Sequence, residues 1–103
     1  MALEVRVERD GSTLRVALCG ELDAHTTTTV ADVVDRAISG NDLSAVVFDA
    51  RELSFMDSAG ISELLRIQRS LSEGGVSIRL EGAGTTVRRV LEITGLLETF
   101  GVQ

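Results

Sequence analysis

The chain has no proline, tryptophan or tyrosine, and three phenylalanines are its only aromatic residues. Aliphatic side chains must therefore fill the core, and 44% apolar residues in a chain of 103 suffice for one core. A single cysteine excludes an internal disulfide bond. There is no signal peptide and no apolar run long enough to cross a bilayer. These absences predict a single domain, residues 1–103, in a reducing cytoplasm, without a membrane partner.

Basic residues are also few, since 10 Lys and Arg stand against 16 Asp and Glu and give a net charge of -6. Nucleic acid is therefore not an expected partner, because its phosphates require basic neutralisation. Any charged protein partner should present a basic surface. One histidine, one cysteine and scattered carboxylates have no ligand spacing, so we expect no metal and no cofactor. Gly82-Ala83-Gly84 resembles half of a dinucleotide loop, but Val87 occupies the third glycine position, which favours a turn.

Hydrophobic periodicity predicts an α/β fold. Apolar residues alternate on both sides of Asp10-Gly11, which indicates an antiparallel hairpin. Three later segments have helical spacing, and two apolar strands lie between them. The expected landmarks are a helix ending at Gly40, a buried strand at 45–48, a helix from Asp57 to Gly74-Gly75, a strand at 76–80, a helix capped by Thr85 and ended by Gly95, and an apolar tail. The order β-β-α-β-α-β-α predicts one mixed sheet with parallel crossovers and helices packed on it.

Two loops are expected to form the functional rim of this sheet. One spans residues 20–25 after the second strand, and the other spans residues 49–58 after the buried third strand. In sheets of this kind, ligands and partners bind beyond the carboxyl ends of the strands. If the two strands are neighbours, Asp23 and Ser58 lie on the same rim.

Residues 55–60, Phe-Met-Asp-Ser-Ala-Gly, are typical of a helix start. Asp57 is the expected N-cap, with Met56 and Ile61 at the hydrophobic-staple positions. The hydroxyl of Ser58 then remains free in the first turn. Gly60 costs about 1 kcal/mol relative to alanine inside a helix. Its presence indicates either close helix packing or the close approach of another backbone or a phosphate.

A free serine also raises the possibility of a small hydrolase. His25 is the only available base for Ser58. A nucleophile elbow would need glycine where Met56 stands, so only half of that motif is present. Cys19, near the end of a strand, is expected to be a small buried apolar residue, with a redox role as the less favoured alternative.

Two segments together resemble a known family. Leu53-Ser54-Phe55-Met56 followed by Asp57-Ser58-Ala59-Gly60 is similar to the motif of bacterial anti-sigma factor antagonists, the single-domain STAS proteins. Gly20-Glu21-Leu22-Asp23 with Thr26 is similar to the second recognisable segment of that family, at matching spacing. The resemblance extends over nearly the whole chain, including the late Thr94-Gly95-Leu96 turn.

The resemblance implies a phosphorylation switch in a regulatory protein that is not an enzyme. Ser58 would be phosphorylated by a partner that is both anti-sigma factor and serine kinase, and a phosphatase would reverse the modification. The unphosphorylated protein would bind that partner and free the sigma factor, and the phosphorylated form would be released. The residues implied in partner binding are Asp23, Met56, Asp57, Ser58, Ala59 and Gly60.

Two departures from the family leave alternatives open. Ala59 stands where many members have a second hydroxyl. The chain also ends soon after Phe100, where relatives often continue into a final helix. Either it is a compact member, or a C-terminal element is missing, in which case an apolar patch near Phe100 would be exposed or covered by a second copy in a weak homodimer. The alternative functions are a STAS module of another pathway, such as a signalling scaffold or a transporter's cytoplasmic domain, and the serine hydrolase.

Overall fold

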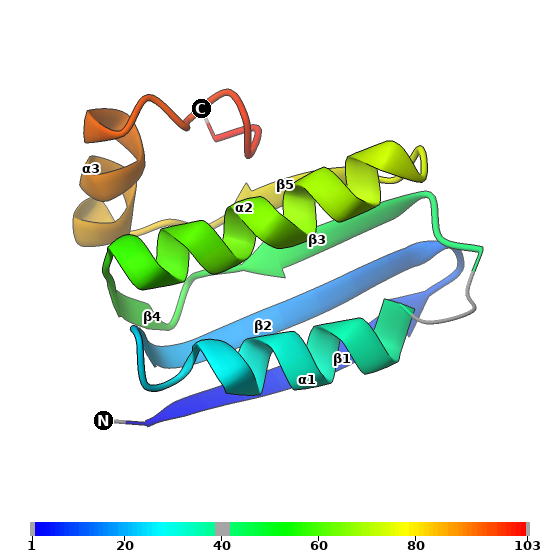
Figure 1. Cartoon of the computed structure of the whole chain (residues 1–103), viewed down its shortest axis with the longest axis horizontal. Helices are drawn as coiled ribbons and strands as arrows, with labels where there is room; N and C mark the ends of the chain where they lie inside the picture. Colours follow the sequence, from blue (N-terminus) through cyan, green and yellow to red (C-terminus); the bar gives the residue numbers. More distant parts are fainter. Residues whose placement is uncertain (1, 39–41, 103) are drawn as a thin grey trace.

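A five-stranded mixed sheet with helices on one face forms the framework of the protein (Figure 1). The computed structural model describes residues 2–38 and 42–102. The elements in chain order are β1 (Leu3–Asp10), β2 (Thr13–Leu22), α1 (Thr27–Ile38), β3 (Ala45–Asp49), β4 (Leu53–Met56), α2 (Ser58–Glu73), β5 (Ser77–Glu81) and α3 (Thr85–Ile93). The predicted α/β class, the opening hairpin and the order of the predicted elements are confirmed.

The strand order is β1-β2-β3-β5, and β4 also pairs with β2. β1 and β2 are antiparallel, with Asp10 opposite Thr13 across a tight turn in which Gly11 has φ +62°. β3 lies parallel to the first half of β2, and β5 lies parallel to β3. β3 is covered by strands on both sides, which is why residues 46–48 are all buried. The crossovers therefore bring the carboxyl ends of these parallel strands to one end of the sheet.

The short strand β4 was not among the predicted elements. Residues 49–58 were expected to form a loop, but Leu53–Met56 pair in parallel with the last residues of β2. Leu53 and Met56 are buried, and the two residues between them are exposed. This burial pattern lacks the strict alternation by which a strand is recognised in a sequence.

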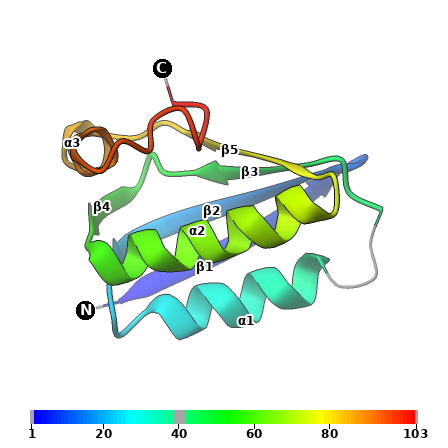
Figure 2. The ribbon, with the colours of Figure 1, turned by 45° about the horizontal axis from the view of Figure 1, so that its top comes forward.

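α1 and α2 cover one face of the sheet, and α3 lies at the end of the sheet beside β4 (Figures 1 and 2). The predicted end of α2 is confirmed, because Gly74 is its C-cap and donates to the Leu71 carbonyl. The predicted end of the first helix at Gly40 falls outside the described residues. Thr85 is the first residue of α3 rather than its cap, since the N-cap is Gly84 and no side chain caps this helix.

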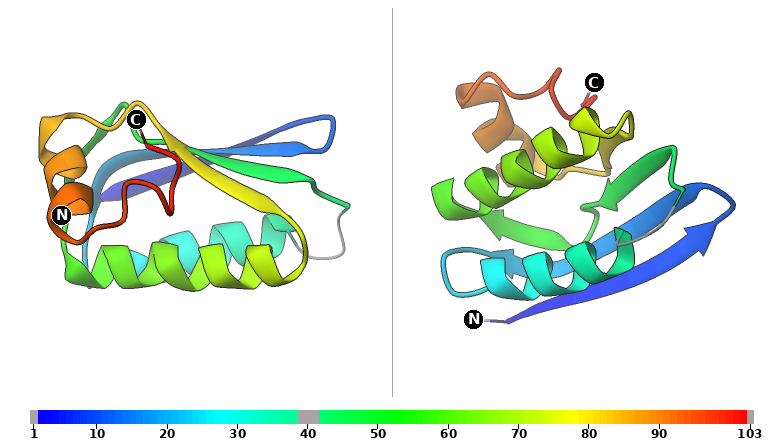
Figure 3. Two further views of the ribbon diagram at one scale, coloured as in Figure 1. Left: turned by 90° about the horizontal axis from the view of Figure 1, so that it is seen from above. Right: turned by 45° about the vertical axis from the view of Figure 1, so that its right-hand side comes forward.

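No helix of the described residues lies over the opposite face of the sheet, as the view from above shows (Figure 3). The inward side chains of β2 and β3 pack under α1 and α2; the core there includes Leu14, Val16, Leu18, Val46 and Phe48. Cys19 lies on the other face, half-buried, with its Sγ 3.3 Å from Arg6 Nη2 and 3.6 Å from Glu52 Oε2. The prediction of a buried apolar Cys19 is therefore wrong, because alternation along β2 turns it away from the core.

The C-terminal tail closes the core instead of leaving it open. Phe100 is fully buried, and its carbonyl accepts a hydrogen bond of 2.8 Å from the Leu80 N–H of β5. Of the two alternatives for this end of the chain, the burial of Phe100 therefore agrees with a compact member and not with an exposed or partner-covered patch. The tail folds back along β5 (Figure 3), so a single chain covers this aromatic ring by itself.

Candidate functional site

Ser58 begins α2 and is exposed at the positive end of the helix. Asp57 is the N-cap, and its Oδ1 accepts a 3.0 Å hydrogen bond from the Gly60 N–H. The Asp57 carbonyl accepts the first helical bond from the Ile61 N–H, at 3.0 Å. Among the described residues, the Ser58 hydroxyl has no hydrogen-bond partner. Capping is thus completed without Ser58, as the sequence predicted, and its Oγ is available to another molecule.

The position of Ser58 is fixed by the pairing of β4 with β2. Met56 lies opposite Leu22 in this parallel pair. The Asp57 N–H then donates to the Leu22 carbonyl at 3.2 Å, so the helix starts where the strand pairing ends. Because Asp23 follows Leu22 and Asp57 follows Met56, the two predicted loops bring Asp23 and Asp57 to the same end of the sheet.

Gly60 is buried where α2 crosses β2 most closely. A Cβ atom at this position would lie 2.7 Å from the Leu22 carbonyl oxygen and 2.8 Å from the Leu22 Cγ. Both distances are below van der Waals contact, so a side chain would push the helix away from the strand. Of the two interpretations of Gly60, close helix packing accounts for the glycine without any other molecule.

Asp23 is 7% exposed, and its own loop uses one of its carboxylate oxygens. Oδ1 accepts bonds from the backbone N–H of His25 at 2.9 Å and of Thr26 at 3.2 Å. Thr26 completes the arrangement, since its hydroxyl donates to the Glu21 carbonyl at 2.8 Å and accepts from the Asp23 N–H at 2.9 Å. The loop between β2 and α1 is therefore held by its own side chains before any partner arrives.

The predicted site residues meet on one rim, but their exposure differs. Ser58 is exposed and Ala59 and Asp57 are half-buried, whereas Met56 is 2% exposed and Gly60 is buried. The last two hold Asp57 and Ser58 in place from below the surface. The contact of all six residues with a partner stays a prediction.

The rim also has exposed residues that the sequence reasoning did not select. Phe55 is 40% exposed on β4, opposite Glu21 of β2, and Ala24 and His25 are exposed in the neighbouring loop. An exposed aromatic side chain beside a functional rim is typical of a protein contact. Phe55 lies within the motif, but its exposure could not be read from the sequence because β4 was not predicted.

No described contact joins Ser58 to His25, the nucleophile and base that the hydrolase alternative requires. His25 enters a hydrogen bond through its backbone, and Ser58 has no base within hydrogen-bond distance in the described part of the chain. In residues 2–38 and 42–102 no group of three or more His, Cys, Asp or Glu side chains is placed to hold a metal ion. No helix within those ranges is both long and apolar enough to cross a membrane.

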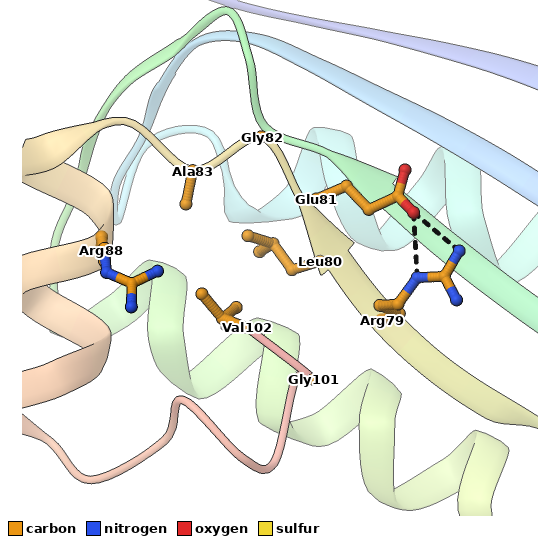
Figure 4. A pocket seen from close by; sticks show the side chains of 8 residues that line it. All are labelled: Arg79, Leu80, Glu81, Gly82, Ala83, Arg88, Gly101 and Val102. Atoms are coloured by element: carbon orange, nitrogen blue, oxygen red, sulfur yellow. Dashed lines mark hydrogen bonds and ion pairs between the residues drawn. The ribbon is translucent and has the colours of Figure 1, made fainter.

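A hollow lies away from Ser58, between β5, α3 and the C-terminal tail (Figure 4). It is open, holds about 500 Å³ and is lined by Arg79, Arg88 and Val102, among others. Arg79 is paired with Glu81, its neighbour on the same side of β5, at 2.7 Å. Gly82, with φ +73°, and Gly84 form the short connection from β5 to α3. The turn predicted at Gly82-Ala83-Gly84 is thus the connection between β5 and α3.

The chain thus combines a mixed sheet, a loop held by its own acidic side chain and an unbonded serine at a helix start. Its exposed groups suit contact with another protein. The STAS domain family matches residues 4–103, so the chain belongs to this family.

Three relatives show what the chain is similar to. It is 31% identical over 98 residues to an anti-sigma F factor antagonist of Paenibacillus polymyxa, covering 95% of this chain and 84% of that protein. The structure of the anti-sigma factor antagonist SpoIIAA in its unphosphorylated form matches with a TM-score of 0.80 and 29% identity, over 90% of this chain and 82% of that one. The Bacillus cell fate determinant SpoIIAA in its phosphorylated form matches with a TM-score of 0.68 and 29% identity, over 90% and 85%.

Proposed function

We propose that the protein is an anti-sigma factor antagonist switched by phosphorylation of Ser58. In the unphosphorylated state it binds an anti-sigma factor that is also a serine kinase, and the sigma factor is freed. Phosphorylation of Ser58 releases the antagonist, and a phosphatase restores it. The observation that supports this function best is the exposed, unbonded Ser58 hydroxyl at the start of α2, in a chain 31% identical to an antagonist of that name.

The effect of a phosphate on the fold itself should be small. A phosphoserine carries about -1.5 to -2 charges, and an anion at a helix N-terminus is stabilised by about 0.3–1 kcal/mol. The capping carboxylate of Asp57 opposes part of this gain by repulsion. Since Ser58 is exposed and makes no hydrogen bond that phosphorylation would break, the domain should remain folded.

The effect on a complex should be much larger. A dianion buried without a partner in an interface costs several kcal/mol. A penalty of about 4 kcal/mol would weaken binding roughly a thousandfold. The free-energy cost of the phosphate in the interface therefore exceeds its stabilisation at the helix N-terminus. Phosphorylation thus releases the partner and does not unfold the domain.

The rim residues have different parts in this proposal. Ser58 accepts the phosphate and Asp57 orients the helix start. Asp23 is held at the same rim by Thr26 and would present its second carboxylate oxygen to a basic group of the partner. Met56 and Gly60 position Asp57 and Ser58, and Ala59 adds contact area. The role of the protein is binding rather than catalysis, in the cytoplasm, with neither nucleic acid nor membrane as a partner.

The experiment is phosphorylation by the anti-sigma factor kinase of the same organism with labelled ATP. Wild type should incorporate label and Ser58→Ala should not. Ser62→Ala is the matched control, because Ser62 is exposed one turn further along α2. Ser58→Asp should lose the complex in a binding assay while its thermal midpoint stays close to that of wild type. Labelling of Ser58→Ala at the wild-type level would show that the acceptor is another residue.

A further inference from the structure

The outer edge of β1 is an unpaired strand edge at the border of the sheet. β1 pairs only with β2, and no described segment runs along its other side (Figures 1 and 3). The opposite border is different, since the tail bonds to β5 through the Leu80 N–H and the Phe100 carbonyl. An uncovered strand edge of eight residues is a template for pairing with another strand.

The ladder between β1 and β2 tells which backbone groups face outward. The Glu21 N–H donates to the Ala2 carbonyl at 3.2 Å, in continuation of the pairing of Leu3 with Gly20. In an antiparallel ladder, alternate residues exchange hydrogen bonds with the neighbouring strand. The even-numbered residues of β1 therefore bond to β2, and the N–H and C=O groups of Leu3, Val5 and Val7 face the open edge.

We propose that this edge pairs with β1 of a second copy of the chain, antiparallel and centred on Val5. In this register each Val5 lies opposite Val5 of the other copy. Glu4 then lies opposite Arg6 of the second copy, and Leu3 lies opposite its Val7. The outward-facing backbone groups of these odd-numbered residues form hydrogen bonds across the two-fold axis (dyad) between the copies. The two sheets then form one continuous sheet.

The charges of β1 select this register. Glu4 and Arg6 have side chains 67% and 59% exposed on the helix-free face of the sheet. Within the chain they form a 3.6 Å ion pair with each other, and Arg6 also contacts Cys19 and Glu52. In the Val5 register these exposed pairs extend across the two copies. Centring on Arg6 would place Arg6 against Arg6 and Glu4 against Glu8. Centring on Val7 would place Glu4 against Asp10. Only the Val5 register joins opposite charges without joining like charges, and opposite-charge pairs across strands are stabilising.

The apolar side chains agree with the charges. Val7 is 38% exposed, one of the few large apolar side chains left open on the described surface. In the Val5 register it packs beside Leu3 of the second copy, on the face covered by α1. The pairing does not involve the Ser58 hydroxyl, so it stands independently of the proposed function.

The test is sedimentation equilibrium of the whole chain at about 0.15 M salt, where charges further apart than about 8 Å are screened. Wild type should show a concentration-dependent mass between one and two copies. Glu4→Arg and Arg6→Glu should each weaken the dimer about tenfold or more, since two attractive pairs become repulsive. A mixture of these two variants restores Arg–Glu pairs across the dyad and should form a heterodimer at least as readily as wild type.

The control is Glu8→Arg, which changes the net charge as much as Glu4→Arg does. In the Val5 register Glu8 faces Ala2 of the second copy, so the dimer should be unaffected. Thermal unfolding of each variant verifies that the monomer is folded. A wild-type chain that stays monomeric up to its solubility limit overturns the proposal. So does a dimer that Glu8→Arg weakens as strongly as Glu4→Arg, or a mixture that shows no rescue.

Discussion

Gly60 is a residue whose identity is set by a backbone atom of a neighbouring strand. The Leu22 carbonyl oxygen would lie 2.7 Å from a Cβ at this position, and a carbonyl in a paired strand cannot move aside as a long side chain can. The sequence showed a glycine in the first turn of a helix but could not show what opposed it. The opposing atom is distant in the chain, and only the pairing of β2 with β4 brings it there.

Gly60→Ala should lower the free energy of unfolding by about 1–3 kcal/mol, the usual cost of overpacking. The gain in helix propensity from alanine, about 1 kcal/mol at most, offsets only part of it. Urea denaturation measures the loss. Gly74→Ala is the matched control, because Gly74 ends the same helix with φ -90° and a Cβ built there would come no closer than 3.6 Å to an atom beyond the adjacent residues. Equal stabilities of the Gly60→Ala variant and wild type would show that the helix can shift without cost.

At the scale of elements, periodicity predicted the strands and helices that are long or regularly patterned. β2 alternates buried and half-buried side chains, so Leu14, Val16 and Leu18 identified it. The same alternation, continued from Leu18, places Cys19 on the outer face of the sheet, so the sequence alone contains enough information to predict its position. β4 has only four residues with buried ends, and its partner in β2 is distant in sequence. A strand of this kind is stabilised by its pairing and not by its own pattern.

The end of β3 has an ion pair that makes stability depend on pH. Asp49, with a side chain 13% exposed, accepts bonds from the Arg51 guanidinium, the shortest being 2.6 Å. These bonds from Arg51 hold the pKa of Asp49 below its ordinary value of 3.8. A carboxylate with a depressed folded-state pKa adds stability above its unfolded pKa, and this stability is lost as the pH falls through the folded value.

Asp49→Asn should therefore destabilise the protein at pH 7 by up to about 1 kcal/mol, since the Arg51 side chain is largely exposed. The difference from wild type should shrink as the pH falls below about 4. Thermal unfolding between pH 7 and pH 3 measures it. Asp32→Asn, an exposed position within α1, is the control. A difference that stays constant over this range would assign the loss to packing rather than to charge.

For the whole molecule, the tail decides whether one chain completes its own core. The sequence indicated an apolar tail but left its destination open, and the resemblance to longer relatives allowed both a compact end and an uncovered patch. Phe100 is fully buried, and its carbonyl occupies the edge of β5. Tertiary contacts over this sequence distance have no local pattern, which is why composition and periodicity could not place Phe100.

Phe100→Ala should destabilise the entire domain by about 3–5 kcal/mol, the usual cost of removing a buried aromatic ring. Because the tail packs on the shared core, the loss should appear as a lower midpoint of a single cooperative urea transition. Ile93→Ala, at a side chain 74% exposed near the tail, should change stability by less than about 0.5 kcal/mol. If the two variants unfold alike, Phe100 is not part of the cooperative core.

The contact of Leu22 with the start of α2 has a consequence for how the sequences of such proteins can diverge. One residue limits the approach of α2 through its side chain and carbonyl, receives the Asp57 N–H and directly precedes Asp23. Ser58, the proposed phosphate acceptor, is thus located by buried atoms, whereas Ala24, His25 and Phe55 beside it are exposed. Substitutions at these three positions can change which partner is recognised without moving Ser58, the proposed site of the switch. Paralogous antagonists in one cell could in this way bind different partners while sharing the same proposed serine phosphorylation.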